Sequence, residues 1–218
     1  DTFEPGSPSK ILTVAAGLEE GILKGNEYFD CGGYLHVGDW DIKCTAYRRG
    51  GHGSLSLTES IMQSCNVAMM RIGAMMGRDI FTKYQTIFGM GQKTGVDLPG
   101  EADAAGLVYS ADKMGPTELA TNAFGQNYNC TMIQMAAALC SVINGGSYYE
   151  PHVVRQILNE QGSVVERKDP VLVRETVSQS TSDFLKEAMF QTVENGTGGA
   201  AKVAGYQVGG KTGTAEKQ

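Results

Sequence analysis

The chain has 218 residues, and its 18 Lys and Arg against 24 Asp and Glu give a formal net charge of -6. This balance excludes a protein that binds nucleic acid through a basic face. Apolar residues make up 41% of the chain, which is enough for a core, and the length predicts one large domain with two lobes possible. Glycine is the outlier, at 29 residues or about 13%, against an average near ~7%.

The first predicted element is a helix that Ser7 caps, that Pro8 begins and that runs to about Lys24. Its apolar residues cover more than one face, which predicts a helix buried on most sides. A hairpin is expected next over residues 34–44, with its turn at Gly38-Asp39.

A second helix is expected to begin at a capping box formed by Ser56 and Glu59. A third helical pattern runs over residues 67–76, and its methionines are expected to fill gaps in the core. Residues 88–103 are rich in glycine and polar side chains and are predicted to form a loop.

The later part of the chain alternates helix and strand patterns. We expect a buried helix over residues 132–144, a hairpin over 153–167, a helix over 182–194 and a strand-like tail over 203–215 that glycines interrupt. This order predicts an α/β protein of the α+β type, in which a helical lobe lies beside an antiparallel sheet lobe.

Ser7 and Lys10 lie three residues apart at a helix start, so their side chains share one face. A helix N-terminus favours negative charge on a serine oxygen, and a lysine near a buried helix can lose its proton and act as a base. The same Ser-x-x-Lys spacing occurs again at Ser110 and Lys113, so the pattern alone does not identify a site.

Two further short motifs accompany this pattern. Ser-x-Asn occurs once, with Ser64 and Asn66, whereas Lys-Thr-Gly occurs twice, beginning at Lys93 and at Lys211. Ser-x-x-Lys, Ser-x-Asn and Lys-Thr-Gly are together the signature of serine β-lactamases and penicillin-binding proteins. In those families the motifs occur in that chain order, on a helix start, an inter-helix loop and a strand. Order and context select Ser7, Ser64 and Lys211, and the second copies are excluded.

The sequence around these motifs resembles the transpeptidase domain of class B penicillin-binding proteins over essentially the whole chain. The matching segments are Glu4-Pro5-Gly6-Ser7, Gly50-Gly51-His52-Gly53, Ser64-Cys65-Asn66, Lys93 to Glu101, Phe124-Gly125-Gln126 and Lys211 to Glu216. The Gly-Gly-His-Gly loop and the Ser-Cys-Asn form of the second motif resemble the elongation and sporulation branch most closely.

The resemblance implies catalytic roles for four residues. Ser7 would be the nucleophile that attacks the carbonyl of the penultimate D-alanine of a stem peptide, with Lys10 as its general base. Ser64 would relay the proton to the leaving amine, and Asn66 would hold Lys10 and the substrate amide.

The same resemblance implies a substrate-binding motif. Lys211, Gly213 and the hydroxyls of Thr212 and Thr214 would recognise the terminal carboxylate of the substrate. The backbone N–H groups of Ser7 and Thr214 would form the oxyanion hole.

The implied function is a D,D-transpeptidase that cross-links peptidoglycan and that β-lactams acylate. Its implied partners are stem peptides and the cell-wall synthesis machinery, its implied location is the extracytoplasmic face of the bacterial membrane, and no cofactor is implied. Residues 1–218 would be a truncated transpeptidase core, because the family has an N-terminal anchor and pedestal and further sheet strands. Two alternatives remain open: a β-lactamase, since Glu118 and Asn122 resemble a hydrolytic pair, and a non-enzymatic β-lactam sensor domain.

Two local features are unusual. The family usually has Phe or Met before the motif lysine, whereas this chain has Ser9, so the packing of the first helical turn needs a structural explanation. Cys31 and Cys44 flank the first hairpin and could form a disulfide. A zinc site made from these cysteines with His36 and His52 has no recognised ligand spacing and is not predicted.

Overall fold

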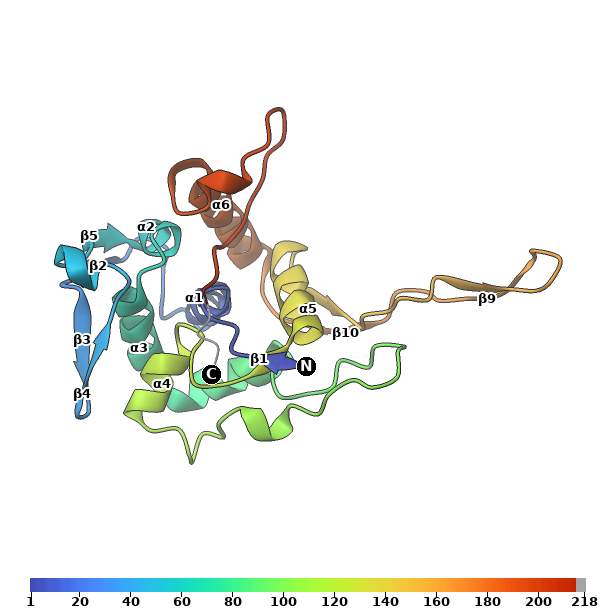
Figure 1. Ribbon diagram of the computed structural model, residues 1–218, viewed down its shortest axis with the longest axis horizontal. Coiled ribbons are helices and arrows are strands. Elements are labelled where there is room, and N and C mark those ends of the chain that lie inside the picture. The colour runs from blue at the N-terminus through green and yellow to red at the C-terminus, as the bar shows by residue number, and fades with distance from the viewer. Residues whose placement is uncertain (215–218) are drawn as a thin grey trace.

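The computed structural model describes residues 1–214, which contain six α-helices, with the first near the centre of the molecule (Figure 1). The helices are α1 (Ser9–Glu19), α2 (Leu57–Met62), α3 (Asn66–Ile87), α4 (Pro116–Asn122), α5 (Met132–Ile143) and α6 (Gln179–Asn195). Helix α1 contacts α3 on one side and α5 and α6 on the other, while α2 packs against α6 and α4 against α3. The prediction of a helix buried on most sides is confirmed, because every residue of α1 from Ser9 to Gly17 is buried.

The strands of residues 1–214 form only two-stranded antiparallel sheets. They are β1 (Thr2–Phe3), β2 (Tyr28–Cys31), β3 (Tyr34–Val37), β4 (Trp40–Lys43), β5 (Gly53–Ser56), β6 (Cys130–Thr131), β7 (Ser147–Tyr149), β8 (Gln156–Leu158), β9 (Val164–Arg167) and β10 (Leu172–Glu175). The pairs are β1 with β6, β2 with β5, β3 with β4, β7 with β10 and β8 with β9. A mixed fold with a small, incomplete sheet lobe agrees with the prediction, and the hairpin β8–β9 projects away from the body (Figure 1).

Both predicted hairpins and the predicted capping box are present. The first hairpin pairs β3 with β4, and the second pairs β8 with β9. The Ser56 hydroxyl accepts the backbone N–H of Glu59 at 3.2 Å, while the Glu59 carboxylate accepts that of Ser56 at 2.8 Å. This reciprocal pair opens α2 and thereby fixes the end of β5.

The start of α1 differs from the prediction in a way that matters for Ser7. The helix begins at Ser9, its N-cap position is occupied by Pro8, and no side chain caps it. Ser7 lies in the preceding turn and contributes only its carbonyl, which accepts the N–H of Lys10 at 3.1 Å. The hydroxyl of Ser7 therefore remains available for other partners. The helix also ends earlier than predicted, because the N–H of Leu23 turns back onto the carbonyl of Gly17 at 2.9 Å.

Three other boundaries shift. Helix α3 continues beyond residue 76 through a kink at Gly77, where φ is 73°, and ends at Ile87. Helix α6 begins three residues earlier than predicted, because the Ser178 hydroxyl accepts the N–H of Thr181 and caps it. The expected strand over 203–215 is not formed in its described part, residues 203–214. No strand lies beside this tail in the described chain, and the N–H of Gly210 instead donates to the carbonyl of Met189 on α6 at 3.1 Å.

Packing of the first helical turn is explained by a buried polar pair. Ser9 is only 2% exposed, and its hydroxyl shares a hydrogen bond of 2.7 Å with the phenol of Tyr128. The carbonyl of Ala123 accepts the hydroxyl of Thr13 one turn later, at 2.8 Å. A polar anchor to the segment 123–128 thus takes the place of a large apolar side chain before Lys10.

Among residues 1–214, no helix combines the length and the apolar character that crossing a membrane requires.

Gly125 brings its segment into direct backbone contact with the turn that carries Ser7. The N–H of Gly6 donates to the carbonyl of Gly125 at 2.8 Å, and a Cβ added at Gly125 would lie 1.9 Å from the carbonyl oxygen of Gly6. Gly125 also has a φ of +93°, a region that L side chains rarely adopt.

We predict that Gly125→Ala lowers the free energy of unfolding by about 3 kcal/mol or more, because backbone strain and a backbone clash add. The matched control is Gly162→Ala, whose φ is +79° but whose added Cβ meets nothing within 4 Å. It should lose only about 1 kcal/mol. Urea denaturation of both variants measures the difference, and equal losses would contradict the proposed clash.

Candidate active site

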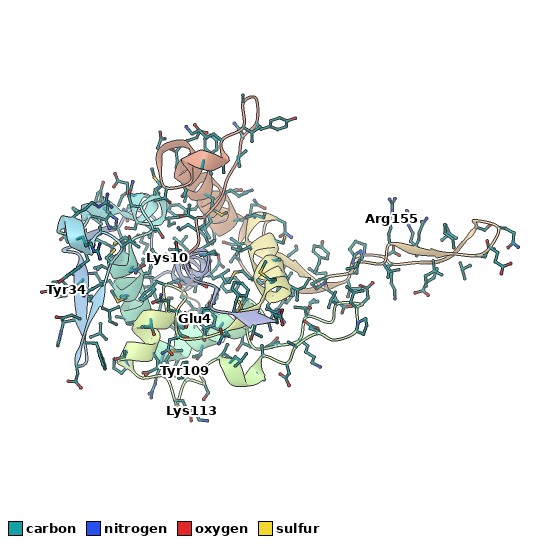
Figure 2. The ribbon with its side chains drawn as sticks, viewed as in Figure 1. Glu4, Lys10, Tyr34, Tyr109, Lys113 and Arg155 are labelled. Carbon is teal, nitrogen blue, oxygen red and sulfur yellow. The ribbon has the colours of Figure 1, made fainter. Side chains whose placement is uncertain are left out.

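Three segments that are distant in sequence meet beside α1. They are the turn that carries Ser7, the loop Ser64–Asn66 between α2 and α3, and residues 211–214 of the tail. Figure 2 shows Lys10 in the middle of the molecule, whereas Lys113 of the second Ser-x-x-Lys pattern lies at its outer edge. Ser110, Lys113 and Lys93 are exposed, so the structure leaves the second motif copies outside this site.

Lys10 is completely buried, with an exposed fraction of 0%. Its Nζ donates to the carbonyl of Ser64 at 2.7 Å, to the Oγ of Ser64 at 3.0 Å and to the Oδ1 of Asn66 at 2.6 Å. All three donor positions of the ammonium group are therefore occupied by one short loop.

Ser64 lies at the centre of the hydrogen-bond network. Its Oγ accepts the Nζ of Lys10 and the Nζ of Lys211, at 2.9 Å, and donates to the Oγ of Ser7 at 3.1 Å. Its backbone has a φ of 54°, the left-handed region that few non-glycine residues occupy. Such strain costs about 1–3 kcal/mol and occurs where surrounding contacts hold the residue in place.

Asn66 is the first residue of α3 and links the loop to the neighbouring strand. Its Oδ1 accepts Lys10, and its Nδ2 donates to the carbonyl of Lys43 at 3.2 Å. The side chain is therefore fixed at both ends, and its amide orientation follows from the two partners.

Residues 211–214 form the opposite wall. The Nζ of Lys211 also donates to the carbonyl and the Oγ1 of Thr212, at 3.1 and 3.3 Å. Gly213 lies against Pro8 at the start of α1, with 3.1 Å between its added Cβ and the Cδ of Pro8. Thr212 and Thr214 both face the cleft that separates this wall from Ser7.

The cleft has a volume of about 620 Å³. Its lining combines the motif residues Ser7, Ser64, Asn66, Thr212 and Thr214 with Gly6, Ile42, Lys43, Cys44, Thr45, Arg49, Gln63, Phe124, Gln126 and Thr197.

The sequence analysis missed several of these lining residues, among them Arg49 and Thr197. Arg49 adds a cation to the cleft, and its position directly before the Gly-Gly-His-Gly loop was an available signal. Thr197 shares a hydrogen bond of 2.9 Å with the Oγ1 of Thr212, and it follows the glycine that ends α6.

Burial changes the acidity of both lysines. The pKa of Lys10 falls from 10.5 to about 7, first because burial removes its hydration and second because the positive charge of Lys211 is nearby. The pKa of Lys211 falls to about 8 because of burial. A lysine with a pKa near 7 is neutral in a large fraction of molecules at neutral pH and can accept a proton.

The network connects Ser7 to Lys10 through Ser64. No direct hydrogen bond joins the Ser7 hydroxyl to the Lys10 amine in residues 1–214, whereas each of them bonds to the Oγ of Ser64. Once Lys10 is neutral, reversal of these two bonds would carry a proton from Ser7 to Ser64 and from Ser64 to Lys10. The arrangement can thus activate a serine nucleophile.

Other candidates from the sequence lie outside this network. Glu118 and Asn122 are not among the residues that line the cleft, and Asn122 instead donates to the carbonyls of Gln126 and Asn127. The disulfide allowed between Cys31 and Cys44 is not formed, since both cysteines are free.

Comparison with known proteins extends this picture. Residues 1–218 match the family described as the penicillin binding protein transpeptidase domain. Stage V sporulation protein D of Bacillus subtilis is 39% identical over 219 residues, which cover 99% of this chain and 33% of that protein. Peptidoglycan D,D-transpeptidase MrdA of Acinetobacter baumannii is 29% identical over 223 residues, which cover 98% of this chain and 33% of that protein. The chain thus spans about a third of the length of these relatives.

Solved structures share the fold. The D,D-transpeptidase domain of a peptidoglycan glycosyltransferase from Eggerthella lenta has a TM-score of 0.90 at 28% identity, covering 100% of this chain and 55% of that one. Penicillin binding protein 3 from Mycobacterium tuberculosis, complexed with aztreonam, has a TM-score of 0.86 at 29% identity, covering 100% and 49%. With a family match over its whole length and this geometry around Ser7, the chain belongs to the penicillin-binding protein transpeptidase family.

Proposed function

We propose that this chain is the core of a peptidoglycan D,D-transpeptidase, which cross-links stem peptides through an acyl-enzyme on Ser7. The observation that carries the proposal is the hydroxyl of Ser64, which bonds at once to Ser7, to the buried Lys10 and to Lys211. Nucleophile, base and carboxylate-binding cation are thereby joined around one atom at the edge of one cleft.

Acylation follows from this arrangement. Ser7 Oγ attacks the carbonyl carbon of the penultimate D-alanine, and its proton passes through Ser64 to neutral Lys10. The peptide bond to the terminal D-alanine then breaks, and the proton returns through Ser64 to the leaving amine. The amine of an acceptor stem peptide then attacks the carbonyl carbon of the resulting ester, the bond from that carbon to the Ser7 Oγ breaks, and the proton of the amine passes to the Ser7 oxygen. This forms the cross-link and restores the Ser7 hydroxyl. The N–H groups of Ser7 and Thr214 are the proposed oxyanion donors, a contribution typically worth ~3–4 kcal/mol per donor.

Substrate recognition is assigned to the opposite wall of the cleft. Lys211, Thr212 and Thr214 would bind the terminal carboxylate, with Gly213 allowing the wall to approach Pro8. An anionic substrate favours the charged form of Lys211, so its binding would counteract the lowering of the pKa by burial.

β-Lactams are proposed to acylate Ser7 at the same site. In support, penicillin binding protein 3 from Mycobacterium tuberculosis has been solved in complexes with aztreonam and with ampicillin. The alternative of a β-lactamase needs a residue that activates water for deacylation. Glu118, the candidate for that role, is not among the residues that line the cleft, and Asn122 is committed to the loop carbonyls of Gln126 and Asn127, which favours the transpeptidase. A β-lactam sensor would share acylation but lack cross-linking.

We further propose that residues 1–218 act as one transpeptidase unit of a longer protein on the extracytoplasmic face of the membrane, where the cell-wall synthesis machinery works. Other parts of that protein would supply a membrane anchor and strands that pair with the tail. Two observations support this proposal. The chain spans only part of the length of its relatives, and residues 203–214 have no strand partner among the described residues.

Incubation with a penicillin should add one covalent adduct per chain, because among residues 1–214 Ser7 is the serine that a buried lysine can activate through a hydrogen-bond network. Intact mass spectrometry should show that Ser7→Ala loses the adduct and that Ser110→Ala, in the second motif copy, keeps it. An adduct on Ser7→Ala would contradict the assignment. Turnover of a chromogenic β-lactam well beyond one equivalent would favour the β-lactamase instead.

The acylation rate constant should rise with pH and reach its half-maximal value near pH 7, as Lys10 loses its proton. Removing the positive charge of Lys211 raises the pKa of Lys10, so Lys211→Met should move this midpoint to higher pH. Lys113→Met, which removes an exposed charge, is the control and should leave the midpoint unchanged. Stopped-flow fluorescence with a fluorescent penicillin measures the profiles, and a flat profile from about pH 6 to about pH 9 would exclude Lys10 as the base.

A further inference from the structure

The active-site cleft differs in charge from the chain as a whole. Lys43 and Arg49 line the cleft, and none of its lining residues within 1–214 is an Asp or a Glu. Lys211 adds a third cation, since its Nζ bonds to Ser64, which also lines the cleft. The whole chain, in contrast, has a formal net charge of -6. A positively charged cleft in an acidic protein favours a ligand with more than one negative group.

Lys43 and Arg49 come from a different part of the chain than the Lys-Thr-Gly wall. Lys43 ends β4, and Arg49 ends the 3-10 helix η1 (Tyr47–Arg49). Figure 1 shows β4 with β5 and α2 on one side of the molecule, whereas residues 211–214 follow the tail that descends from α6. The carbonyl of Lys43 accepts the Nδ2 of Asn66 at 3.2 Å. This side of the cleft is therefore the side of Asn66.

Contacts within the chain hold both cations in place. The N–H groups of Arg49 and Gly51 donate to the carbonyl of Ala46, at 2.9 and 3.1 Å, and Ala46 is completely buried. The Nζ of Lys43 lies 4.7 Å from the centre of the Tyr47 ring, which is a cation–π contact. Both charges are thus carried by an ordered segment at the edge of the cleft.

Neither charge is neutralised within the described chain. The ion pairs of residues 1–214 include neither Lys43 nor Arg49, and both side chains are exposed. The guanidinium group of an arginine offers a planar pair of donors that fits a carboxylate. Arg49 is therefore free to bind a carboxylate of a ligand in the cleft.

The proposed binding mode of the substrate determines which part would meet these cations. Its terminal carboxylate lies at residues 211–214, and the carbonyl that Ser7 attacks lies one residue before it. The amide on the N-terminal side of that residue is the group assigned to Asn66. The next residue of the peptide then extends past Asn66, towards Lys43 and Arg49.

We propose that Arg49 and Lys43 bind a second carboxylate of the acyl donor, on the N-terminal side of the D-alanine that Ser7 attacks. This inference rests on the proposed transpeptidase function and specifies its substrate. The donor peptide is held at two points, with its terminal carboxylate at residues 211–214 and an earlier carboxylate at Arg49 and Lys43. Arg49 is thereby a specificity-determining residue, which distinguishes an acidic donor from its neutral analogue.

Two penicillins that differ by one carboxylate test the proposal. Carbenicillin is benzylpenicillin with an added carboxylate on the side chain, which takes the place of the peptide before D-alanine. The ratio of their acylation rate constants, carbenicillin over benzylpenicillin, isolates the effect of that carboxylate. Arg49→Gln should lower the ratio about fivefold, because it removes a positive charge beside the added carboxylate, and adding Lys43→Gln should lower it further. Intact mass spectrometry over time measures both rate constants.

Two further variants serve as controls for the penicillin ratio. Arg48→Gln removes the neighbouring exposed charge, which does not line the cleft, and should leave the ratio unchanged. Arg49→Lys keeps the charge and should retain most of the ratio. An equal fall of the ratio in Arg48→Gln and Arg49→Gln would overturn the proposal.

Salt provides a readout that a change in packing would not move. Ions screen exposed charges, so the ratio for the unsubstituted chain should fall as NaCl rises from about 20 mM to about 500 mM. In the double variant Lys43→Gln, Arg49→Gln the ratio should be nearly independent of salt. The same salt dependence in both proteins would contradict the assignment of the second carboxylate to these cations.

A binding measurement does not require acylation. With Ser7→Ala, a labelled peptide that has Glu directly before D-alanyl-D-alanine should bind about fivefold more tightly than its Gln analogue. Adding Arg49→Gln should abolish this difference in Kd, which fluorescence anisotropy measures. Equal Kd values for the two peptides would overturn the proposal. If benzylpenicillin does not acylate Ser7, the transpeptidase assignment fails, whereas the peptide pair still decides whether a second carboxylate is bound.

Discussion

A positive charge in the core of this protein has to be satisfied, and the catalytic region is arranged around that requirement. The ammonium group of Lys10 has no access to water, and an unpaired charge in such a place costs several kcal/mol. The chain meets this cost in two ways. Three oxygen acceptors of the loop Ser64–Asn66 surround the nitrogen, and the pKa falls so that the charge is easily given up. The burial that destabilises the charged form of Lys10 also makes this lysine suitable as a base.

The loop Ser64–Asn66, which holds the three oxygen acceptors of Lys10, is itself strained. Ser64 occupies the left-handed region, and its carbonyl and hydroxyl both reach Lys10 from there. Stabilising contacts lie on each side, where Cys65 caps α3 by accepting the N–H of Ala68 and Asn66 bonds to the carbonyl of Lys43. Strained geometry at Ser64 is therefore supported by a helix start and a strand end, both on rigid elements.

Local signals in the sequence predicted those parts of the structure that depend on neighbouring residues. The capping box of Ser56 and Glu59 and the turn at Gly38-Asp39 each act within a few residues, and both hairpins were found. The motif residues Ser7, Ser64 and Lys211 could be chosen over their second copies from chain order together with local context, since the glycine-rich segment around Lys93 predicts a loop. What the sequence could not predict was contact between distant segments, such as the polar anchor from Ser9 to Tyr128 or the packing of the tail on α6. The tail has a strand-like pattern, but a strand needs a partner, and none of the described residues provides one.

The contact between Gly6 and Gly125 has a mechanical consequence for the cleft. Two peptide backbones touch there with no side chain between them, so the distance from the turn of Ser7 to the segment Phe124–Gln126 is fixed by groups that every residue type shares. This wall can neither widen by a rotamer change nor be adjusted by a larger or smaller side chain. The facing wall, residues 211–214, has no regular secondary structure, and side-chain hydrogen bonds from Lys211 and Thr212 hold it in place. When the width of the cleft changes, on binding or in evolution, residues 211–214 therefore move. The wall that carries the nucleophile Ser7 stays in place.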